Sequence, residues 1–151
     1  MKPLAVLIVA FAVALVCTHI FKGGWHLAFA GNTAMAVMLL FTALGHFLFM
    51  RGMALMLPDF IPAKKEIVML TGMWEVCFAA GLLVPETRHT VAYLLIAFFL
   101  LVLPANINAA LKRVDFRKAS YEGSGVEYLW LRIPIQVFYI GWVIYFALII
   151  S

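Results

Sequence analysis

Glu75 is the residue in this chain with the clearest chemical potential, because it places a carboxylate inside a stretch that is otherwise typical of a membrane helix. Between Ile67 and Val84, only Thr71 and Glu75 are neither apolar nor small. An ionisable side chain at that depth costs ~3 kcal/mol or more and usually faces a protein interior with a partner. The sequence therefore predicts that other helices supply partners for Glu75, which could then handle protons.

Polar side chains on three other apolar stretches are the candidate partners. They are Thr42 and His46, four residues apart on one helical face, Asn106 and Asn108 after Pro104, and Arg132, Gln136 and Tyr139 along one stripe of the last stretch. A rise of about 1.5 Å per residue places the strongly polar groups in the same half of the membrane. We expect Glu75 and His46 to act as catalytic proton carriers. The other six residues are expected to line a pocket for a ligand: Thr42, Asn106, Asn108, Arg132, Gln136 and Tyr139.

Each candidate also has a structural interpretation that the sequence leaves open. Glu75 could serve only to fix helix packing, and the asparagines could only join helices. Arg132 could extend toward the membrane surface, as arginines near helix ends do. His46 could be a haem ligand, a proton relay or a simple hydrogen-bond partner. No metal site is predicted, because no histidine or cysteine spacing matches a metal motif.

Composition indicates a membrane protein with several spans. The 151 residues are 66% hydrophobic and 12% charged, and the mean hydropathy of +1.07 is too high for a soluble domain of this length. The net charge of +4 comes from lysines and arginines in short loops between apolar stretches. We therefore attribute the charge to membrane topology and expect the lipid bilayer, and no nucleic acid, as a partner.

Five apolar stretches predict an all-α membrane protein. We expect spans at Leu4–Phe21, Thr33–Met50, Ile67–Val84, Thr90–Leu111 and Leu131–Ile150, with a turn at residues 85–88. The first is interpreted as a retained helix, since no small-residue cleavage site follows it. Residues 51–65 are too interrupted to span and too apolar for an ordinary loop, so we expect a re-entrant or interfacial piece.

The distribution of basic residues predicts the orientation of the chain. Five spans put the two ends on opposite sides, and nine of the eleven lysines and arginines then share one side. Cytoplasmic loops carry such an excess, so the N-terminus is predicted in the cytoplasm and the C-terminus outside. We expect the polar pocket to open toward the cytoplasm.

Several short motifs, in order and at similar spacing, resemble the DoxX-like family of small bacterial integral membrane proteins. They are Gly45-His46-Phe47, the piece from Met56 to Pro62, Thr71-Gly72 with Glu75, Leu82 to Pro85, Pro104 to Ile107 and Leu131 to Gln136. The resemblance implies a four-helix transmembrane bundle over residues 32–151, with residues 1–31 as an additional N-terminal helix and outer loop. It also implies a bacterial inner membrane and points to His46, Glu75, Asn106, Arg132 and Gln136.

The family's association with quinol-linked and thiol-linked respiratory chemistry gives the leading functional expectation. By this resemblance the chain is expected to be an accessory subunit of a quinone- or thiol-linked redox system, that is, an oxidoreductase subunit without a self-contained catalytic motif. A quinone is then the expected cofactor, and a redox partner protein supplies the electrons. Two alternatives remain open: a binding or transport module for a small lipophilic molecule, and a purely structural scaffold. Assembly into a homo-oligomer is compatible with each.

Overall fold

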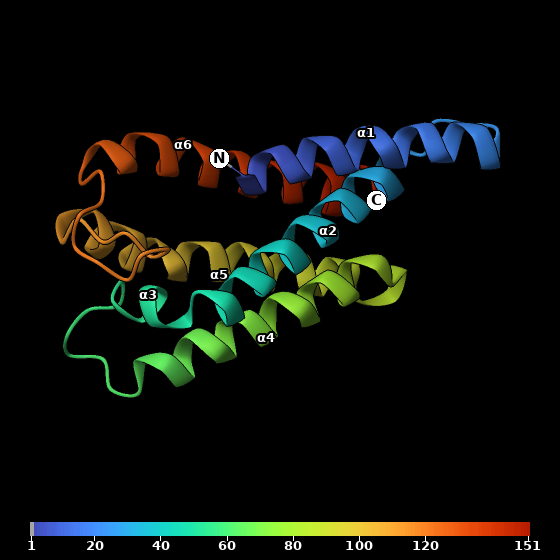
Figure 1. Cartoon of the computed structure of the whole chain (residues 1–151). Helices are drawn as coiled ribbons and strands as arrows, with labels where there is room; N and C mark the ends of the chain where they lie inside the picture. Colours follow the sequence, from blue (N-terminus) through green and yellow to red (C-terminus); the bar gives the residue numbers. More distant parts are fainter. Residues whose placement is uncertain (1) are drawn as a thin grey trace.

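The computed structural model describes residues 2–151, apart from the side chains of Lys22 and Tyr128, and within that range the fold is all-helical. The helices are α1 (Lys2–Lys22), α2 (Leu27–Leu48), the short α3 (Met50–Ala54), α4 (Lys64–Leu83), α5 (Pro85–Leu111), α6 (Glu127–Val143) and the π-helix η1 (Ile144–Ile149). Figure 1 shows their arrangement. The expected all-helical class is confirmed.

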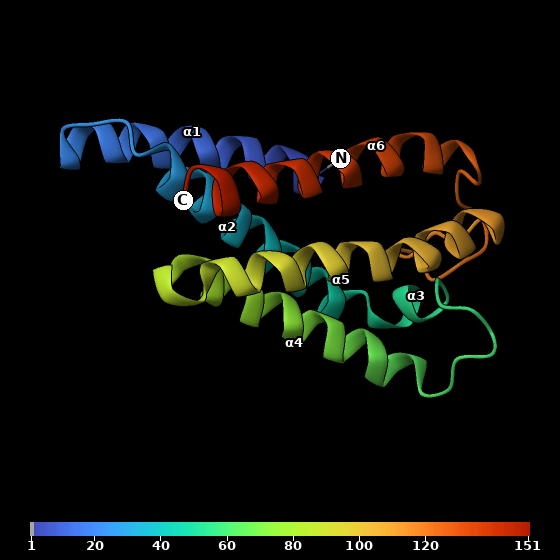
Figure 2. The same ribbon diagram turned by 180° about the vertical axis from the view of Figure 1, so that it is seen from behind.

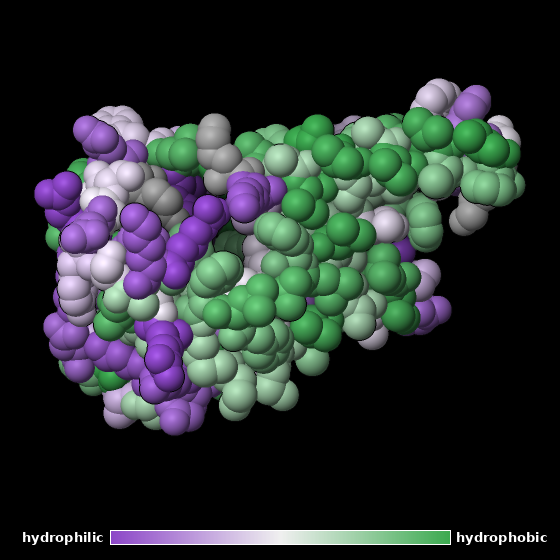
Figure 3. Space-filling view, in the orientation of Figure 1, coloured by the Kyte–Doolittle hydropathy of each residue, from purple (hydrophilic) through white to green (hydrophobic). Residues whose placement is uncertain are grey.

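Within the described residues 2–151, five segments are long and apolar enough to cross a membrane. They are Lys2–Phe21, Leu27–Leu48, Lys64–Leu83, Pro85–Leu111 and Leu129–Ile149. Helices suit a bilayer because every backbone group finds its partner within the segment. Apolar side chains cover most of the length of the bundle, and hydrophilic ones gather at one end (Figure 3). We call this hydrophilic end, which carries α3 and the start of α6, the inner end; the opposite end is the outer end.

Helix α2 runs diagonally through the bundle and determines which helices can meet. At the outer end it lies beside α1 and η1, and toward the inner end it lies beside α4 (Figures 1 and 2). Helix α6 packs mainly on α5 and meets α2 at few positions. The inner half of the bundle therefore consists of two neighbouring pairs, α2 with α4 and α5 with α6.

The apolar core joins all five long segments. Its largest fully buried side chains are Leu7, Met35, Met38, Leu39, Leu82, Leu95 and Val143. Helix α1 is the most peripheral span, and its Phe11 ring packs edge-on against Trp142 and Phe146. The core thus lies toward the middle and outer end of the bundle, which leaves the inner half to the polar residues.

All five long helices begin earlier than the sequence predicted, and α2 and α5 differ the most. Helix α2 starts at Leu27 instead of Thr33, and Asn32 lies inside it with its amide donating to the carbonyls of Ala28 and Phe146. Helix α5 starts at Pro85, so residues 85–88 form its first turn and not the expected loop. Proline suits the first helical position, because its fixed φ is already helical and that position needs no N–H partner.

The C-terminal span changes its winding in a way the sequence did not indicate. It continues from α6 into the π-helix at Ile144. The Phe146 carbonyl accepts from Asn32 Nδ2 at 2.9 Å, and Trp142 Nε1 donates to the Gly31 carbonyl at 3.0 Å. These two interhelical bonds hold the wider turn against α2, and widened turns of this kind are often found near functional sites.

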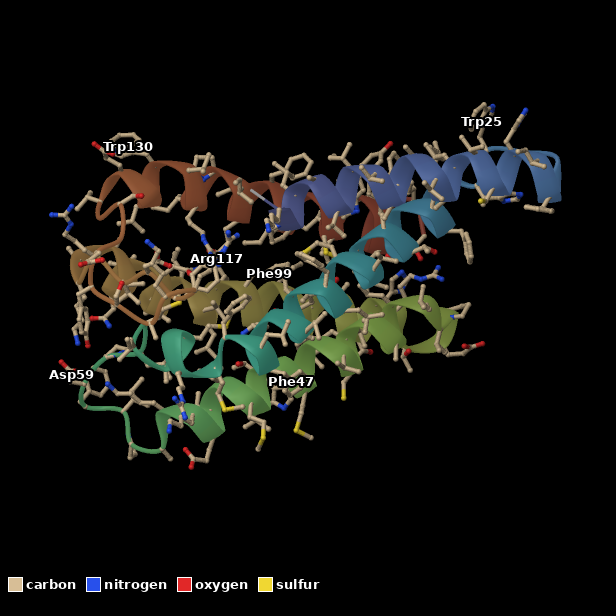
Figure 4. All side chains as sticks on the ribbon, in the orientation of Figure 1. Trp25, Phe47, Asp59, Phe99, Arg117 and Trp130 are labelled. Atoms are coloured by element: carbon tan, nitrogen blue, oxygen red, sulfur yellow. The ribbon has the colours of Figure 1, made fainter. Side chains whose placement is uncertain are left out.

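The segment between α3 and α4 does not span the membrane and is fastened to α5. Asp59 lies between Lys112 Nζ at 2.6 Å and Lys64 Nζ at 3.1 Å, and Asn108 Nδ2 donates to the Met56 carbonyl at 2.7 Å. Asp59 marks the inner end in Figure 4. The hydrogen bonds from Lys112 and then Lys64 hold the pKa of the Asp59 carboxyl below its usual range. Residues 55–63 are therefore fixed to both α4 and α5.

Candidate functional site

Glu75 points into the interface between α4 and α2, where it meets His46. Its side chain is only 7% exposed, and its Oε2 lies 3.1 Å from Nδ1 of His46. The buried positions of α4 are Val68, Gly72, Glu75, Ala79 and Leu82, a spacing of three and four residues that marks one helical face. Helix α2, one of the helices that the sequence suggested, therefore supplies His46 as a partner for Glu75.

The His46 ring uses one nitrogen for two acceptors. Nδ1 lies 3.0 Å from the carbonyl of Thr42, one turn earlier in α2, as well as beside Glu75 Oε2. A carbonyl only accepts, so we assign the hydrogen to Nδ1. The Thr42 carbonyl and Glu75 Oε2 share this one hydrogen. Glu75 Oε2 is therefore a buried oxygen without a full hydrogen bond. Glu75 therefore keeps an acceptor for a further donor.

A glycine makes the close approach of α4 to α2 possible. A Cβ added at Gly72 would lie 2.9 Å from the Cβ of His46 and 3.4 Å from the ring of Phe47. Real Cβ atoms are almost never that close, so a larger residue would separate the two helices. Gly72 thus sets the distance across which His46 and Glu75 meet.

A second polar pair joins α5 to α6. Asn106 Nδ2 donates to Oε1 of Gln136 at 3.4 Å, and Gln136 Nε2 donates to the backbone carbonyl of Phe99. All three residues are buried, and Phe99 lies inside the bundle in Figure 4. Oδ1 of Asn106 is buried without a hydrogen-bond partner in the described part of the chain. This pair, like Glu75, therefore offers an unused acceptor.

Arg132 adds a positive charge near the α2–α4 pair. It lies one turn before Gln136 on α6 and is partly buried, and its guanidinium is close enough to act electrostatically on both His46 and Tyr139. The Tyr139 ring is half-buried, with its centroid 5.9 Å from that of Phe99. We use the name inner polar cluster for His46, Glu75, Asn106, Arg132 and Gln136.

Two candidate residues make their hydrogen bonds elsewhere. The Thr42 hydroxyl donates back to the carbonyls of Met38 and Leu39 in its own helix. Only the backbone carbonyl of Thr42 contacts the site, where it accepts a hydrogen bond from His46 Nδ1. Asn108 donates to Met56 and so fastens the segment after α3. Neither side chain takes part in the inner polar cluster.

Two cavities lie away from the inner polar cluster. One, of about 570 Å³, is at the inner end and includes Arg51 and Lys65 in its lining. The other, of about 490 Å³, is at the outer end beside His26 and Arg88. Within residues 2–151, no group of three or more histidine, cysteine or acidic side chains is placed to hold a metal ion. The cluster is therefore a set of packed polar contacts between helices.

Sequence reasoning missed the groups that complete these contacts. The Phe99 carbonyl is a backbone acceptor and carries no side-chain signal. Asp59 and Lys112 are the pair that the sequence could have suggested, because each stands at the end of an apolar stretch on the same predicted side. Their pairing across fifty-three positions, however, depends on the fold.

Comparison with protein families gives one match, over residues 35–147, to the family described as Domain of unknown function (DUF8561). The chain belongs to this family. The DUF8561 match begins within α2, so α1 lies outside it, and all five residues of the inner polar cluster lie inside it. Neither the curated proteins nor the solved structures include a match to the chain.

Proposed function

We propose that the protein is a membrane subunit that holds a lipophilic carrier of the quinone class beside the Glu75–His46 pair and handles its protons, while a partner protein exchanges the electrons. The observation that supports this proposal is a buried carboxylate in an apolar helix, 3.1 Å from an imidazole, with a buried oxygen left without a full hydrogen bond. Intramembrane ionisable residues of this kind usually mark proton or ligand paths.

The chemistry assigned to the pair is a balanced proton and electron transfer. A bound quinol would donate one hydroxyl to Glu75 Oε2, and the Glu75 carboxylate would take up the first proton. His46 already carries a hydrogen on Nδ1, so its Nε2 would take up the second proton. Oxidation of the quinol to the quinone releases two protons and two electrons, and the electrons pass to a redox group on the partner protein. The chain itself carries no metal-binding or flavin motif in its sequence.

The finer architecture and location are part of the same proposal. We place α2, α4, α5 and the α6–η1 segment as a four-helix unit of the DoxX-like type, with α1 as an addition. The inner end carries most of the basic side chains, so we assign it to the cytoplasm of a bacterial inner membrane, with the N-terminus inside. Cysteine labelling from each side of intact cells would test this orientation, and labelling of the loop 112–126 from outside would contradict it.

Extraction of bound small molecules from the full-length protein tests the function. Purified protein in mild detergent should carry a quinone, identified by its ultraviolet difference spectrum and by mass spectrometry. Loss of a hydrogen bond to a charged group costs about 1.5–3 kcal/mol, so Glu75→Gln should weaken quinol binding by about ten- to a hundred-fold. Glu86→Gln is the matched control, because Glu86 is exposed in the first turn of α5 at the outer end.

One observation favours a different function, that of a scaffold. Each polar pair joins two neighbouring helices, and neither of the two described cavities is lined by the cluster. If the purified protein carries no quinone and Glu75→Gln changes only thermal stability, the scaffold interpretation replaces the redox one. A different co-purified lipophilic molecule that is lost in Glu75→Gln would instead identify a binding module.

A further inference from the structure

The inner end of the bundle carries a cavity that the proposed function does not use. It is about 570 Å³ in volume and lies between α3, the first turn of α4 and the loop after α5. Ala54, Leu55 and Ala119 contribute apolar surface to its lining. Arg51, from α3, and Lys65, from α4, bring positive charge to it from two separate elements. The cavity thus combines an apolar surface with a cationic edge.

The charge of the cavity is positive even after its internal partners are counted. Lys64 also lines it, but its ammonium is engaged by Asp59 at 3.1 Å and by the Leu57 carbonyl at 3.3 Å. Glu66 is the acidic residue of the lining. Arg51 and Lys65 are exposed, and neither takes part in an ion pair within the described part of the chain. These two cations are therefore placed to meet an anion from outside the protein.

The position of the cavity indicates where that anion comes from. The lining of the cavity comes from α3, the first turn of α4 and the loop after α5, all at the inner end. Hydrophilic side chains gather at this end, and apolar ones cover the bundle beyond it (Figure 3). Just beyond it along α4, the apolar side chains of Met69 and Leu70 are exposed on the surface of the span. In a bilayer, phospholipid headgroups occupy this level and their acyl chains cover such a face.

We propose that this cavity binds the phosphate-bearing headgroup of an anionic phospholipid, with Arg51 and Lys65 as its ligands and the acyl chains along α4. Guanidinium and ammonium groups are the usual side chains for phosphate recognition. Basic pockets between membrane helices on the cytoplasmic side bind anionic headgroups. A free phosphate anion would share this chemistry, but the apolar lining and the exposed face of α4 favour the lipid.

Titration of the full-length protein with defined lipids tests the proposal. Native mass spectrometry in detergent compares phosphatidylglycerol with phosphatidylcholine of the same acyl chains, and the anionic lipid should bind at least about tenfold more tightly. Each cation near a membrane surface contributes about five-fold in affinity, so Arg51→Gln combined with Lys65→Gln should weaken phosphatidylglycerol binding about thirty-fold. The matched control is Arg117→Gln with Lys118→Gln, two exposed cations at the same end that do not line the cavity.

Three results would overturn the assignment. The first is equal binding of the two lipids, and the second is unchanged phosphatidylglycerol binding in the double variant. The third is displacement of the lipid by millimolar inorganic phosphate, which would make the cavity a site for the free anion. Circular dichroism checks that the variants fold, and if the double variant does not, Lys65→Gln alone should still weaken binding about five-fold. None of these results depends on the Glu75–His46 pair, so the two proposals stand or fall separately.

Discussion

The contact between Glu75 and His46 predicts a measurable energetic coupling between α4 and α2. Removing one partner of a buried ion pair in a soluble protein costs about 3–5 kcal/mol. In membranes, polar contacts between helices average ~0.6 and reach ~1.7 kcal/mol, because the unfolded state also finds partners. His46 Nδ1 keeps the Thr42 carbonyl at 3.0 Å when Glu75 is changed, which favours the membrane estimate. We therefore expect a coupling of about 1 kcal/mol.

A double-mutant cycle measures this coupling. It compares the wild type, Glu75→Gln, His46→Gln and the double variant by reversible unfolding in mixed detergent micelles. A parallel cycle pairs Glu75→Gln with Glu86→Gln and should be additive within about 0.5 kcal/mol, because Glu86 is exposed at the other end of the bundle. A coupling for the first cycle that is no larger than this control would refute the pairing.

Three further outcomes follow from other contacts. Gly72→Ala should destabilise the fold by about 1–3 kcal/mol in the same unfolding assay, because the new Cβ would lie 2.9 Å from that of His46; an unchanged unfolding midpoint would contradict the close approach. Because the pKa of Asp59 is lowered, its ion pairs should hold at neutral pH and be lost as pH falls below about 4, seen as reduced amide protection after α3, and Asp59→Asn should abolish this dependence. Gln136→Ala should cost about 1–2 kcal/mol by leaving the Asn106 amide without its partner, and a neutral result would argue against the α5–α6 pair.

The five apolar helices could be predicted from sequence because each is a run of about twenty residues with few charges. The depth of a residue along its helix follows from the same count, which placed Glu75 and His46 in the same half of the membrane, and the two side chains do meet. Boundaries were less well predicted where a helix begins in small or polar residues. Asn32 lies outside the predicted span, which begins at Thr33, but it is inside α2 and its amide bonds to the carbonyls of Ala28 and Phe146.

The depth of a residue in the membrane could not predict which side chains meet. Depth does not give the rotation of a helix about its own axis or show which helices lie next to each other. Asn106 and Asn108 are two residues apart and therefore about 200° apart around a helix, so they point to different partners. The first bonds to Gln136 and the second to Met56. The division of the polar residues into an α2–α4 pair and an α5–α6 pair likewise depends on the diagonal course of α2.

The fastening of the segment after α3 ties the inner ends of three helices into one unit. Asp59 bridges Lys64 at the start of α4 and Lys112 at the end of α5, and α2 is held to α4 by close packing at Gly72. Helix α6 meets α2 at few positions and is joined to α5 through Gln136. The place of α6 at the inner end therefore depends on α5, and through Asp59 on the short segment that precedes α4.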